Sequence, residues 1–254
     1  MGNKICHMIT QTLTQVCRSC GSNDIVKNGT NRCGSQQYYC KSCGARRVLT
    51  PKQGYTMQER LMILRAYQER MSLRGLQRVF GVWRGTVLRW LRRQVAALPK
   101  LSQTLLPPQA SDVLELDECW TFVQQCFFER WLWTAMCRRT RQIVAYAIGD
   151  RSQTTCRKLK DRLPHGYRDV LLVADGWEAY QQVFPDDQLQ VYRGVRGPTN
   201  HAERWYNTLR QRLGRYTRKT LSFSKSDHYH ALVTHAFIVR YNLAILHSSL
   251  TLQP

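Results

Sequence analysis

Apolar side chains recur every three or four positions between residues 57 and 95, which is the spacing of one face of an α-helix. Ser72 is placed to cap a second helix of this segment, and Gly81 lies where that helix should stop. A third helix is expected from about Trp83. The side chains predicted to face the interior of these three helices are Leu61, Leu64, Tyr67, Met71, Leu73, Leu76, Val79, Phe80, Val87, Trp90 and Leu91.

From residue 112 onward, strand-like and helix-like stretches alternate. The predicted order is three strands, a helix, a buried strand, a short helix, a weak strand and a long helix, which is the order of an RNase H-like sheet. A mixed five-stranded sheet is therefore expected, with its first and fourth strands as neighbours. The principal segments are residues 113–119, 130–137, 142–148, 152–163, 169–174, 188–192 and 199–213.

Four of the ten cysteines form two close pairs, Cys17-x-x-Cys20 and Cys40-x-x-Cys43, with 19 residues between the pairs. A two-residue gap lets both thiolates of a pair reach one ion, and the residues between the pairs can form a β-hairpin that brings them together. A glycine follows each pair and permits the positive φ that such turns often need. We expect one structural Zn²⁺ on these four thiolates, and this small region should depend on it to fold.

The remaining cysteines are interpreted as buried small hydrophobes, because none has a partner at ligand spacing. Cys6 and His7 match no ligand pattern. The six residues are Cys6, Cys33, Cys119, Cys126, Cys137 and Cys156.

The net charge of +21 predicts attraction to a polyanion, either nucleic acid or an anionic membrane surface. No stretch approaches the roughly 18 consecutive apolar residues of a membrane span. Residues 1–10 have no apolar signal-peptide core. We therefore expect a cytoplasmic, nucleoid-associated protein with a nucleic-acid partner and no membrane partner.

The third predicted helix is rich in arginine and follows a short helix and a glycine turn, which are the parts of a helix-turn-helix. Arginine contacts both phosphates and guanine edges. The alternative is a three-helix bundle whose arginines form a solvated face. The residues predicted to bind DNA here are Arg84, Thr86, Arg89, Arg92 and Arg93.

Three carboxylates converge if the sheet is RNase H-like. Asp117 lies near the end of the first strand, Asp175 directly follows the fourth, and Glu203 is in the first turn of the last helix. Their mutual repulsion calls for cations, and an all-carboxylate set favours two Mg²⁺ (or Mn²⁺) ions about 3.5–4 Å apart. Alternatively, these are turn residues and a helix-dipole partner. Glu118 is predicted to point to the opposite face and to be non-catalytic.

The basic stretch from Arg204 to Lys225 contains no acidic residue. Asn207 and Arg210 share a helix face with Glu203, so they are placed to contact DNA near the carboxylates. Solvation of the helix is the alternative interpretation for both. Arg215 and Lys219 are also predicted to bind DNA.

The predicted organisation is multidomain. A zinc ribbon covers residues 1–53, an all-α helix-turn-helix domain covers 54–97, and an α/β RNase H-like catalytic domain covers 112–254. Residues 98–111 contain three prolines and no period, so they are predicted to be a linker.

Four stretches carry a resemblance: Leu116-Asp-Glu-Cys-Trp120, Ala174-Asp-Gly-Trp-Glu-Ala-Tyr180, Asn200-His-Ala-Glu-Arg-Trp-Tyr-Asn207 and Leu221-Ser-Phe-Ser-Lys-Ser226. Together with the four-cysteine front end, they make the chain similar to the DDE transposases of the insertion-sequence-one family. The resemblance implies cutting and joining of double-stranded DNA at terminal inverted repeats and at a target, with metal ions on Asp117, Asp175 and Glu203.

Two element ends call for two active sites, so a homodimer or larger complex on DNA is expected. Two other functions fit parts of the pattern. A DNA-binding transcriptional regulator would keep the front end with a non-catalytic nuclease-like domain. A junction-resolving nuclease would share the fold but would not need a sequence-recognising front end.

Overall fold

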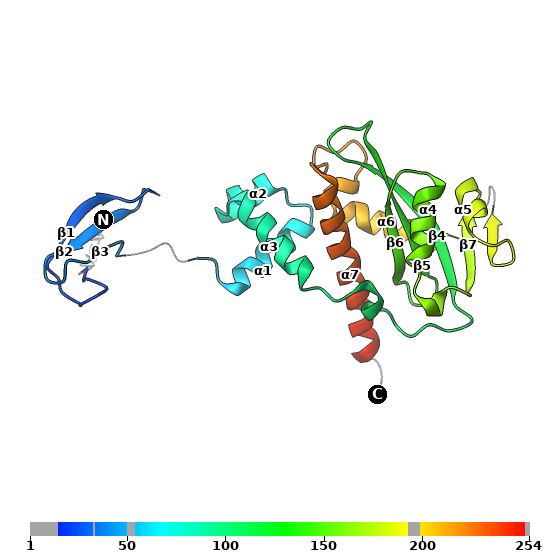
Figure 1. Cartoon of the computed structure of the whole chain (residues 1–254), viewed down its shortest axis with the longest axis horizontal. Coiled ribbons are helices and arrows are strands. Elements are labelled where there is room, and N and C mark those ends of the chain that lie inside the picture. The colour runs from blue at the N-terminus through cyan, green and yellow to red at the C-terminus, as the bar shows by residue number, and fades with distance from the viewer. Residues whose placement is uncertain (1–14, 33, 50–53, 193–198, 252–254) are drawn as a thin grey trace, which may run out of the picture. The chain divides into compact units, whose positions relative to one another are not determined.

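The computed structural model describes residues 15–32, 34–49, 54–192 and 199–251. The chain divides into two compact units, Met1–Thr56 and Met57–Pro254 (Figure 1). Cys6, His7 and Cys33, which were considered above, lie outside the described residues.

The first unit contains a small antiparallel sheet of strands β1 (Ile25–Thr30), β2 (Gln36–Cys40) and β3 (Arg46–Arg47), in that order. The expected hairpin between the cysteine pairs is present, and its register pairs Ile25 with Cys40. This pairing places the second cysteine pair beside the start of β1. The first pair directly precedes β1, so the hairpin brings both pairs to one end of the sheet.

The second unit begins with three helices, α1 (Met57–Gln68), α2 (Leu73–Phe80) and α3 (Arg84–Ala96). The Ser72 hydroxyl caps α2 by accepting the backbone N–H of Gly75, and Gly81 ends α2 with a φ of 65°. Both features match the sequence prediction. Two side chains predicted to face the interior are exposed instead: Leu61 (37%) and Val79 (65%). The buried face of α1 is formed by Ile63, Leu64, Tyr67 and Gln68, and that of α2 by Leu76.

A mixed five-stranded sheet follows, as predicted. Its strands are β4 (Val113–Phe122), β5 (Glu129–Cys137), β6 (Ile143–Gly149), β7 (Leu171–Asp175) and β8 (Leu189–Tyr192). The spatial order is β6-β5-β4-β7-β8, with β4 antiparallel to β5 and parallel to β7. The first and fourth strands of this sheet are therefore neighbours. β4 is longer than predicted, so Asp117 lies in its middle rather than near its end.

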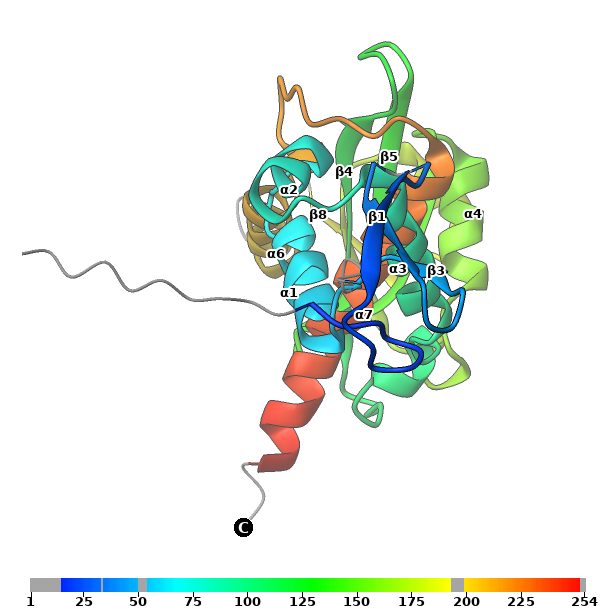
Figure 2. The same ribbon diagram turned by 90° about the vertical axis from the view of Figure 1, so that its left-hand side faces the viewer.

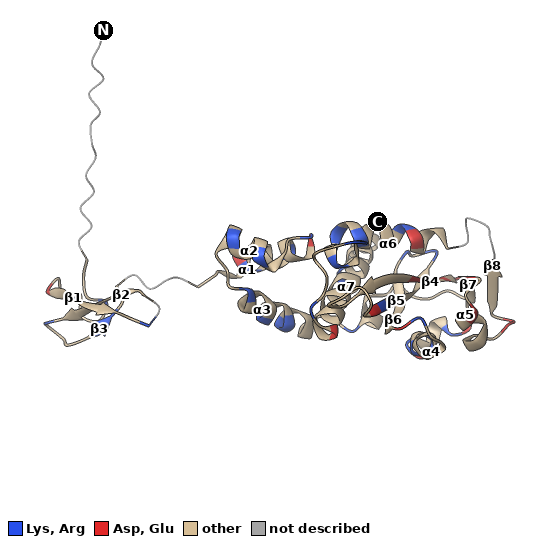
Figure 3. Ribbon diagram, turned by 90° about the horizontal axis from the view of Figure 1, so that it is seen from above, with Lys and Arg blue, Asp and Glu red and all other residues tan. Residues whose placement is uncertain are grey.

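Helices cover both faces of the sheet (Figure 3). α4 (Gln153–Asp161) and α5 (Glu178–Val183) pack on one face, and α6 (Asn200–Arg212) packs on the other. The long helix α7 (Asp227–Thr251) packs against β6 and α3 and was missed by the sequence prediction. No described helix has the length and apolar character needed to cross a membrane.

Part of the segment predicted as a linker is docked on the sheet. Residues Leu101–Thr104 form a short 3₁₀ helix, and the Thr104 side chain is buried. The Gln142 amide donates to the Thr104 carbonyl at 2.8 Å and accepts the Leu106 N–H at 2.8 Å. The Asn242 amide of α7 donates to the Thr104 hydroxyl at 3.2 Å. Buried hydrogen bonds thus fix this segment to β6 and α7. Two further 3₁₀ turns, His165–Tyr167 and Gly214–Tyr216, connect other elements.

Candidate metal and active sites

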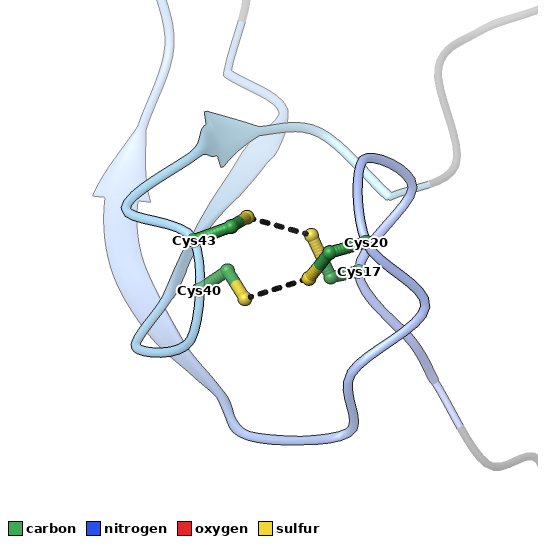
Figure 4. Close-up of side chains that lie close together, drawn as sticks. All are labelled: Cys17, Cys20, Cys40 and Cys43. Atoms are coloured by element: carbon green, nitrogen blue, oxygen red, sulfur yellow. Dashed lines mark hydrogen bonds between the residues drawn. The ribbon is translucent and has the colours of Figure 1, made fainter.

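The four paired cysteines gather into one cluster (Figure 4). The sulfur atoms of Cys17 and Cys43 are 3.7 Å apart, those of Cys20 and Cys40 are 3.6 Å apart, and all four lie within 4.8 Å of one another. A tetrahedral zinc ion with 2.3 Å Zn–S bonds separates its sulfurs by about 3.8 Å. The cluster therefore has the size of a structural zinc site.

Local backbone geometry supports ligation by thiolates. The turns after the two pairs use positive φ at Gly21 (75°) and Gly44 (71°). The Ser19 N–H donates to the Cys17 sulfur at 3.4 Å, and backbone hydrogen bonds from Ser19 and then Cys20 lower the pKa of Cys17 to about 6. For Cys20, a backbone hydrogen bond from Ser22 lowers the pKa, but the hydrogen bond with Cys43 and burial outweigh it and raise the pKa to about 12. Binding of a metal ion to all four thiolates would therefore release protons.

The other described cysteines are divided between core and surface. Cys119, Cys137 and Cys156 are buried, as predicted. Cys126 is exposed, so the interpretation of this residue as a buried hydrophobe was wrong. It lies in the loop between β4 and β5, beyond the last buried residues of β4, where no core is available to cover it.

Asp117 and Asp175 lie on neighbouring strands. β4 and β7 run parallel with Leu116 opposite Ala174, so the next residue of each strand is one of the two aspartates. Glu203 lies in the first turn of α6, which packs on β4. Burial, and then the negative charges of Glu118, Asp175 and Glu203, raise the pKa of Asp117 well above its ordinary value. The fold thus brings the three predicted carboxylates into one electrostatic neighbourhood.

The carboxylates are spaced more widely than the thiols. Within the described ranges, the cysteine cluster is the one group of three or more such side chains whose ligand atoms all lie within 4.8 Å of one another. Like charges at close range repel, and a bound cation lowers the energy of bringing them together. Asp117 and Asp175 are half-buried, whereas Glu203 is exposed, so Glu203 has the most freedom to move inward.

A fourth carboxylate, which the sequence prediction missed, fixes the helix that bears Glu203. Glu115 is fully buried on β4 and accepts the backbone N–H groups of His201 at 3.0 Å and Ala202 at 3.1 Å. His201 Nδ1 and Arg138 Nε also contact its Oε1 atom, at 2.6 and 2.9 Å. A carboxylate at a helix N-terminus satisfies orphan N–H groups and the helix dipole. The available signal was a charged residue inside a strand, two positions from Asp117.

The side chain of Tyr206 ties the middle of α6 to the same strand. Its hydroxyl donates to the Asp117 backbone carbonyl at 2.8 Å and lies 2.7 Å from the Thr134 hydroxyl. Tyr206 is buried. Together with Glu115, it fixes both the start and the middle of α6 on β4, so the position of Glu203 relative to Asp117 is determined by two anchors.

Glu118 lies on the opposite face from Asp117, as predicted, where its partners come from the connection before α4 and from α5. Its carboxylate accepts hydrogen bonds from Arg151 at 2.6 and 3.0 Å and from the Tyr180 hydroxyl at 2.7 Å. The Arg151 guanidinium stacks on Trp177 at 3.8 Å and on Trp131 at 4.5 Å. Burial raises the pKa of Glu118. These contacts support the turn that follows Asp175.

The predicted DNA-binding residues of α3 form an exposed basic face (Figure 3). Arg84, Arg89, Arg92 and Arg93 are exposed, and Thr86 is half-buried. Two arginines that the sequence prediction did not name, Arg74 and Arg78 of α2, line a hollow together with Arg84. Arg74 and Arg78 are four residues apart, so they lie on one face of a helix, and this spacing could have identified them from the sequence.

The predicted DNA-binding residues of α6 and the segment after it differ in their contacts. Asn207 and Lys219 are exposed. Arg210 is half-buried, and its Nη2 atom is 3.3 Å from the Cys119 sulfur. Arg215 donates to the Ser224 hydroxyl and to the Tyr67 hydroxyl, each at 2.9 Å, so it links this segment to α1.

Comparison with known proteins identifies the family. The sequence model of IS1 transposases matches residues 112–243. The InsB protein of the insertion element iso-IS1n of Shigella dysenteriae is 35% identical over 129 residues, which are 51% of this chain and 95% of that protein. The InsB protein of IS1 4 from Escherichia coli (strain K12) is 34% identical over 148 residues, 56% of this chain and 86% of that protein. The chain is thus a transposase by family. It belongs to the IS1 transposase family.

A solved structure is similar at a much greater distance. The simian T-cell lymphotropic virus intasome in complex with PP2A regulatory subunit B56 gamma matches with 9% identity and a TM-score of 0.35, over 69% of this chain and 64% of that one. This likeness is too weak to support an argument about the site.

Proposed function

We propose that this chain is a DNA transposase that binds the terminal inverted repeats of its element and catalyses metal-dependent strand cleavage and strand transfer at Asp117, Asp175 and Glu203. One observation carries the proposal. Asp117 and Asp175 lie on adjacent parallel strands, and both Asp175 and Glu203 act electrostatically on Asp117. The mixed sheet with β4 between β5 and β7 supports an RNase H-like assignment for this domain.

The donor set fits divalent metal ions that prefer oxygen. Asp117, Asp175 and Glu203 would hold two Mg²⁺ (or Mn²⁺) ions, since three carboxylates in one neighbourhood repel one another without cations. When bound, the ions supply activation of a water or a DNA 3′-hydroxyl and charge stabilisation at the leaving oxygen. Cys17, Cys20, Cys40 and Cys43 would hold one structural Zn²⁺.

The chain's own residues bind and orient the DNA. The arginines of α3 would recognise the ends as part of a helix-turn-helix formed by α2, the Gly81 turn and α3. Asn207 and Arg210 lie on the face of α6 that includes Glu203, where they would hold a phosphate near the reacting bond. Glu115 and Tyr206 hold α6 in place while the substrate binds.

The test is Glu203→Gln, with the nicked strand mapped on a DNA duplex bearing the element's own inverted repeat and Mg²⁺. We expect cleavage and transfer to be abolished and end binding to be retained, because the amide keeps the size of the side chain and removes its charge. The matched control is Glu178→Gln, an exposed first-turn glutamate of α5, which should transfer normally. Normal transfer by the Glu203→Gln variant would refute the metal-ligand assignment.

Two element ends must be processed together, so we propose that the chain acts as a homodimer or larger assembly on DNA, in the cytoplasm and associated with the nucleoid. Light scattering of the complex with paired ends should give at least two chains per complex. A strictly monomeric complex that joins both ends would contradict this part of the proposal.

A further inference from the structure

The loop between β4 and β5 exposes two aromatic side chains. Phe127 is 67% exposed and Phe128 is 44% exposed, and their ring centroids are 4.6 Å apart. We call residues Gln124–Phe128 the aromatic tip. Large exposed apolar side chains that lie together mark a binding surface in many proteins. Their contact with water is unfavourable unless a partner covers them.

Backbone hydrogen bonds hold the aromatic tip in place. The Val123 N–H donates to the Phe128 carbonyl at 3.1 Å, and the Phe128 N–H donates to the Gln125 carbonyl at 2.9 Å. Behind the tip, the Phe122 ring lies 5.5 Å from both Trp120 and Phe223. The two exposed rings are therefore presented on a packed base.

A basic segment runs beside the aromatic tip. We call residues Thr217–Lys225 the basic loop. The Gln124 N–H donates to the Ser224 carbonyl at 2.7 Å, and Val123 forms a β-bridge with Ser224. Figures 1 and 2 both show this loop, in orange, crossing beside the β4–β5 hairpin, in green. Arg218, Lys219 and Lys225 are exposed on it, and it contains no acidic residue.

The basic loop also connects the aromatic tip to the carboxylates. The Thr217 hydroxyl, at the start of this loop, donates to the Arg210 carbonyl at 3.1 Å. The Arg210 Nη2 atom in turn lies 3.3 Å from the sulfur of Cys119, two residues beyond Asp117 on β4. Positive charge extends from the candidate active site along β4 to the exposed rings.

We propose that the aromatic tip and the basic loop form a DNA contact in which Phe127 and Phe128 stack on bases while Arg218, Lys219 and Lys225 hold the adjacent phosphates. The proposal deepens the proposed function, on which it rests. Positive charge favours nucleic acid as the partner, because cationic side chains beside aromatic rings are complementary to phosphates and bases. The same surface on a second copy carries the same positive charge, so two copies are not complementary at this surface.

The geometry also predicts where on the DNA the contact falls. Val123, which directly follows β4, lies six positions after Asp117, which is about 20 Å at about 3.3 Å per residue. DNA rises about 3.4 Å per nucleotide of a strand. For a DNA strand that follows β4, we therefore expect the aromatic tip to meet bases about six nucleotides from the cleaved phosphate.

The native Cys126 can be used to map this position by cross-linking, because its thiol is exposed and it directly precedes Phe127. The full-length protein would be mixed with inverted-repeat duplexes that bear a disulfide-activated thiol tether on one base, moved stepwise from the cleavage site. Cross-linking should peak about six nucleotides away and disappear in Cys126→Ser, which removes the thiol alone. A flat profile that equals the Cys126→Ser background at every position would overturn the proposal.

Stacking is tested with 2-aminopurine in the same duplexes and with paired variants. Phe127→Ala/Phe128→Ala should lose the fluorescence change at the contacted base and weaken end binding about 10-fold or more, as expected when base stacking on the rings is lost. Phe127→Trp/Phe128→Trp should keep both. Phe127→Leu/Phe128→Leu keeps apolar area without a ring and should behave like the Ala pair.

The outcomes separate this proposal from the proposed function. Unchanged fluorescence and affinity in the Ala pair, with Mg²⁺-dependent cleavage intact, would remove the tip contact and leave the transposase assignment standing. A tip contact in a protein that shows no metal-dependent cleavage would keep the contact and refute the transposase assignment. If the Ala pair instead lowers the sedimentation coefficient of the DNA-free protein and the Leu pair does not, the surface joins two copies of the chain and the DNA proposal is wrong.

Discussion

Glu115 Oε2 accepts the backbone N–H of His201 at 3.0 Å, and this contact joins the strand of Asp117 to the helix of Glu203. The same oxygen accepts the Ala202 N–H at 3.1 Å. Glu115 lies two residues before Asp117, and His201 lies two residues before Glu203. One buried carboxylate therefore sets the spacing between two of the proposed metal ligands without binding a metal ion itself.

We predict that Glu115→Ala lowers the rate of strand transfer about 100-fold at saturating DNA, since a displacement of about 1 Å at a reacting centre can cost that much. End-binding affinity should stay within twofold, because the hydrogen-bond partners of Glu115 are the start of α6 and Arg138 rather than α3. Single-turnover kinetics and a gel-shift titration measure the two quantities separately.

His201→Ala is the matched control for this prediction. It removes the imidazole contact to Glu115 but keeps the backbone N–H groups that the carboxylate accepts. We expect its transfer rate to fall less than 10-fold. If His201→Ala were as slow as Glu115→Ala, the side chain of His201, rather than the anchored start of α6, would be the important partner.

Much of the fold could be predicted because local patterns agree with it. Ser72 and Gly81 mark the ends of α2 through capping chemistry, which depends on neighbouring residues only. The apolar run before Asp175 is a buried strand, as expected of a strand covered on both faces. The cysteine spacing likewise predicted a cluster that depends only on a hairpin between two pairs.

The rest depends on contacts between distant segments. Glu115 becomes a helix anchor only because α6, more than 80 residues later, packs on β4. Val79 has an apolar side chain at helical spacing but no neighbour covers it, so the period alone was misleading. α7 was missed, although its interior positions Val233, Phe237 and Ile238 are apolar and buried. The convergence of Asp117, Asp175 and Glu203 was predicted from element order, and their role as ligands stays a prediction.

Removal of zinc should unfold the first unit and leave the second intact. The small sheet of β1, β2 and β3 has few buried side chains, so the metal ion would supply most of its folding free energy. With a strong chelator, or in Cys40→Ser, the amide resonances of residues 15–49 should collapse to unfolded positions while those of 57–251 keep their dispersion.

Cys126→Ser is the control for the zinc experiment, because this exposed cysteine lies outside the cluster. It should retain one zinc ion per chain by native mass spectrometry and an unchanged amide spectrum. An unchanged spectrum of residues 15–49 after complete chelation would mean that the hairpin folds without a metal ion, and the structural zinc assignment would then be wrong.

The ion pair of Asp112 and Arg139 predicts a pH-dependent stability. Arg139 donates to both oxygens of Asp112 at 2.6 and 2.9 Å, and these hydrogen bonds lower the pKa of Asp112 below its usual 3.8. A lowered folded-state pKa gives stability that is present above pH 3.8 and is lost as the pH falls through the folded-state value. The Asp112 side chain is buried but that of Arg139 is 38% exposed, so we expect Asp112→Asn to cost about 2 kcal/mol at pH 7.

Urea unfolding between pH 7 and pH 3 measures this difference. The gap between the wild-type chain and Asp112→Asn should narrow below about pH 4, in the range set by the lowered pKa of Asp112. Asp161→Asn, at an exposed position of α4, should match the wild-type chain at every pH. A gap that stays constant down to pH 3 would show that the ion pair is not its source.

The Arg151 guanidinium should matter for the position of Asp175 through Trp177. It stacks on the Trp177 ring at 3.8 Å, and the Trp177 backbone N–H donates to Asp175 Oδ1 at 3.1 Å, so the ring and the carboxylate belong to one turn. Arg151→Lys keeps the charge beside Glu118 but loses the planar group that fits between two tryptophans. We expect its transfer rate to fall about 10-fold and its apparent Mg²⁺ requirement to rise by a similar factor, as is common when groups that orient metal ligands are changed.

Lys160→Arg, on the same side of the sheet at Phe184, keeps a cation over an aromatic ring and should leave both values unchanged. The Mg²⁺ titration is the discriminating measurement, since a loss of stability alone would lower the amount of active protein without moving the midpoint for Mg²⁺.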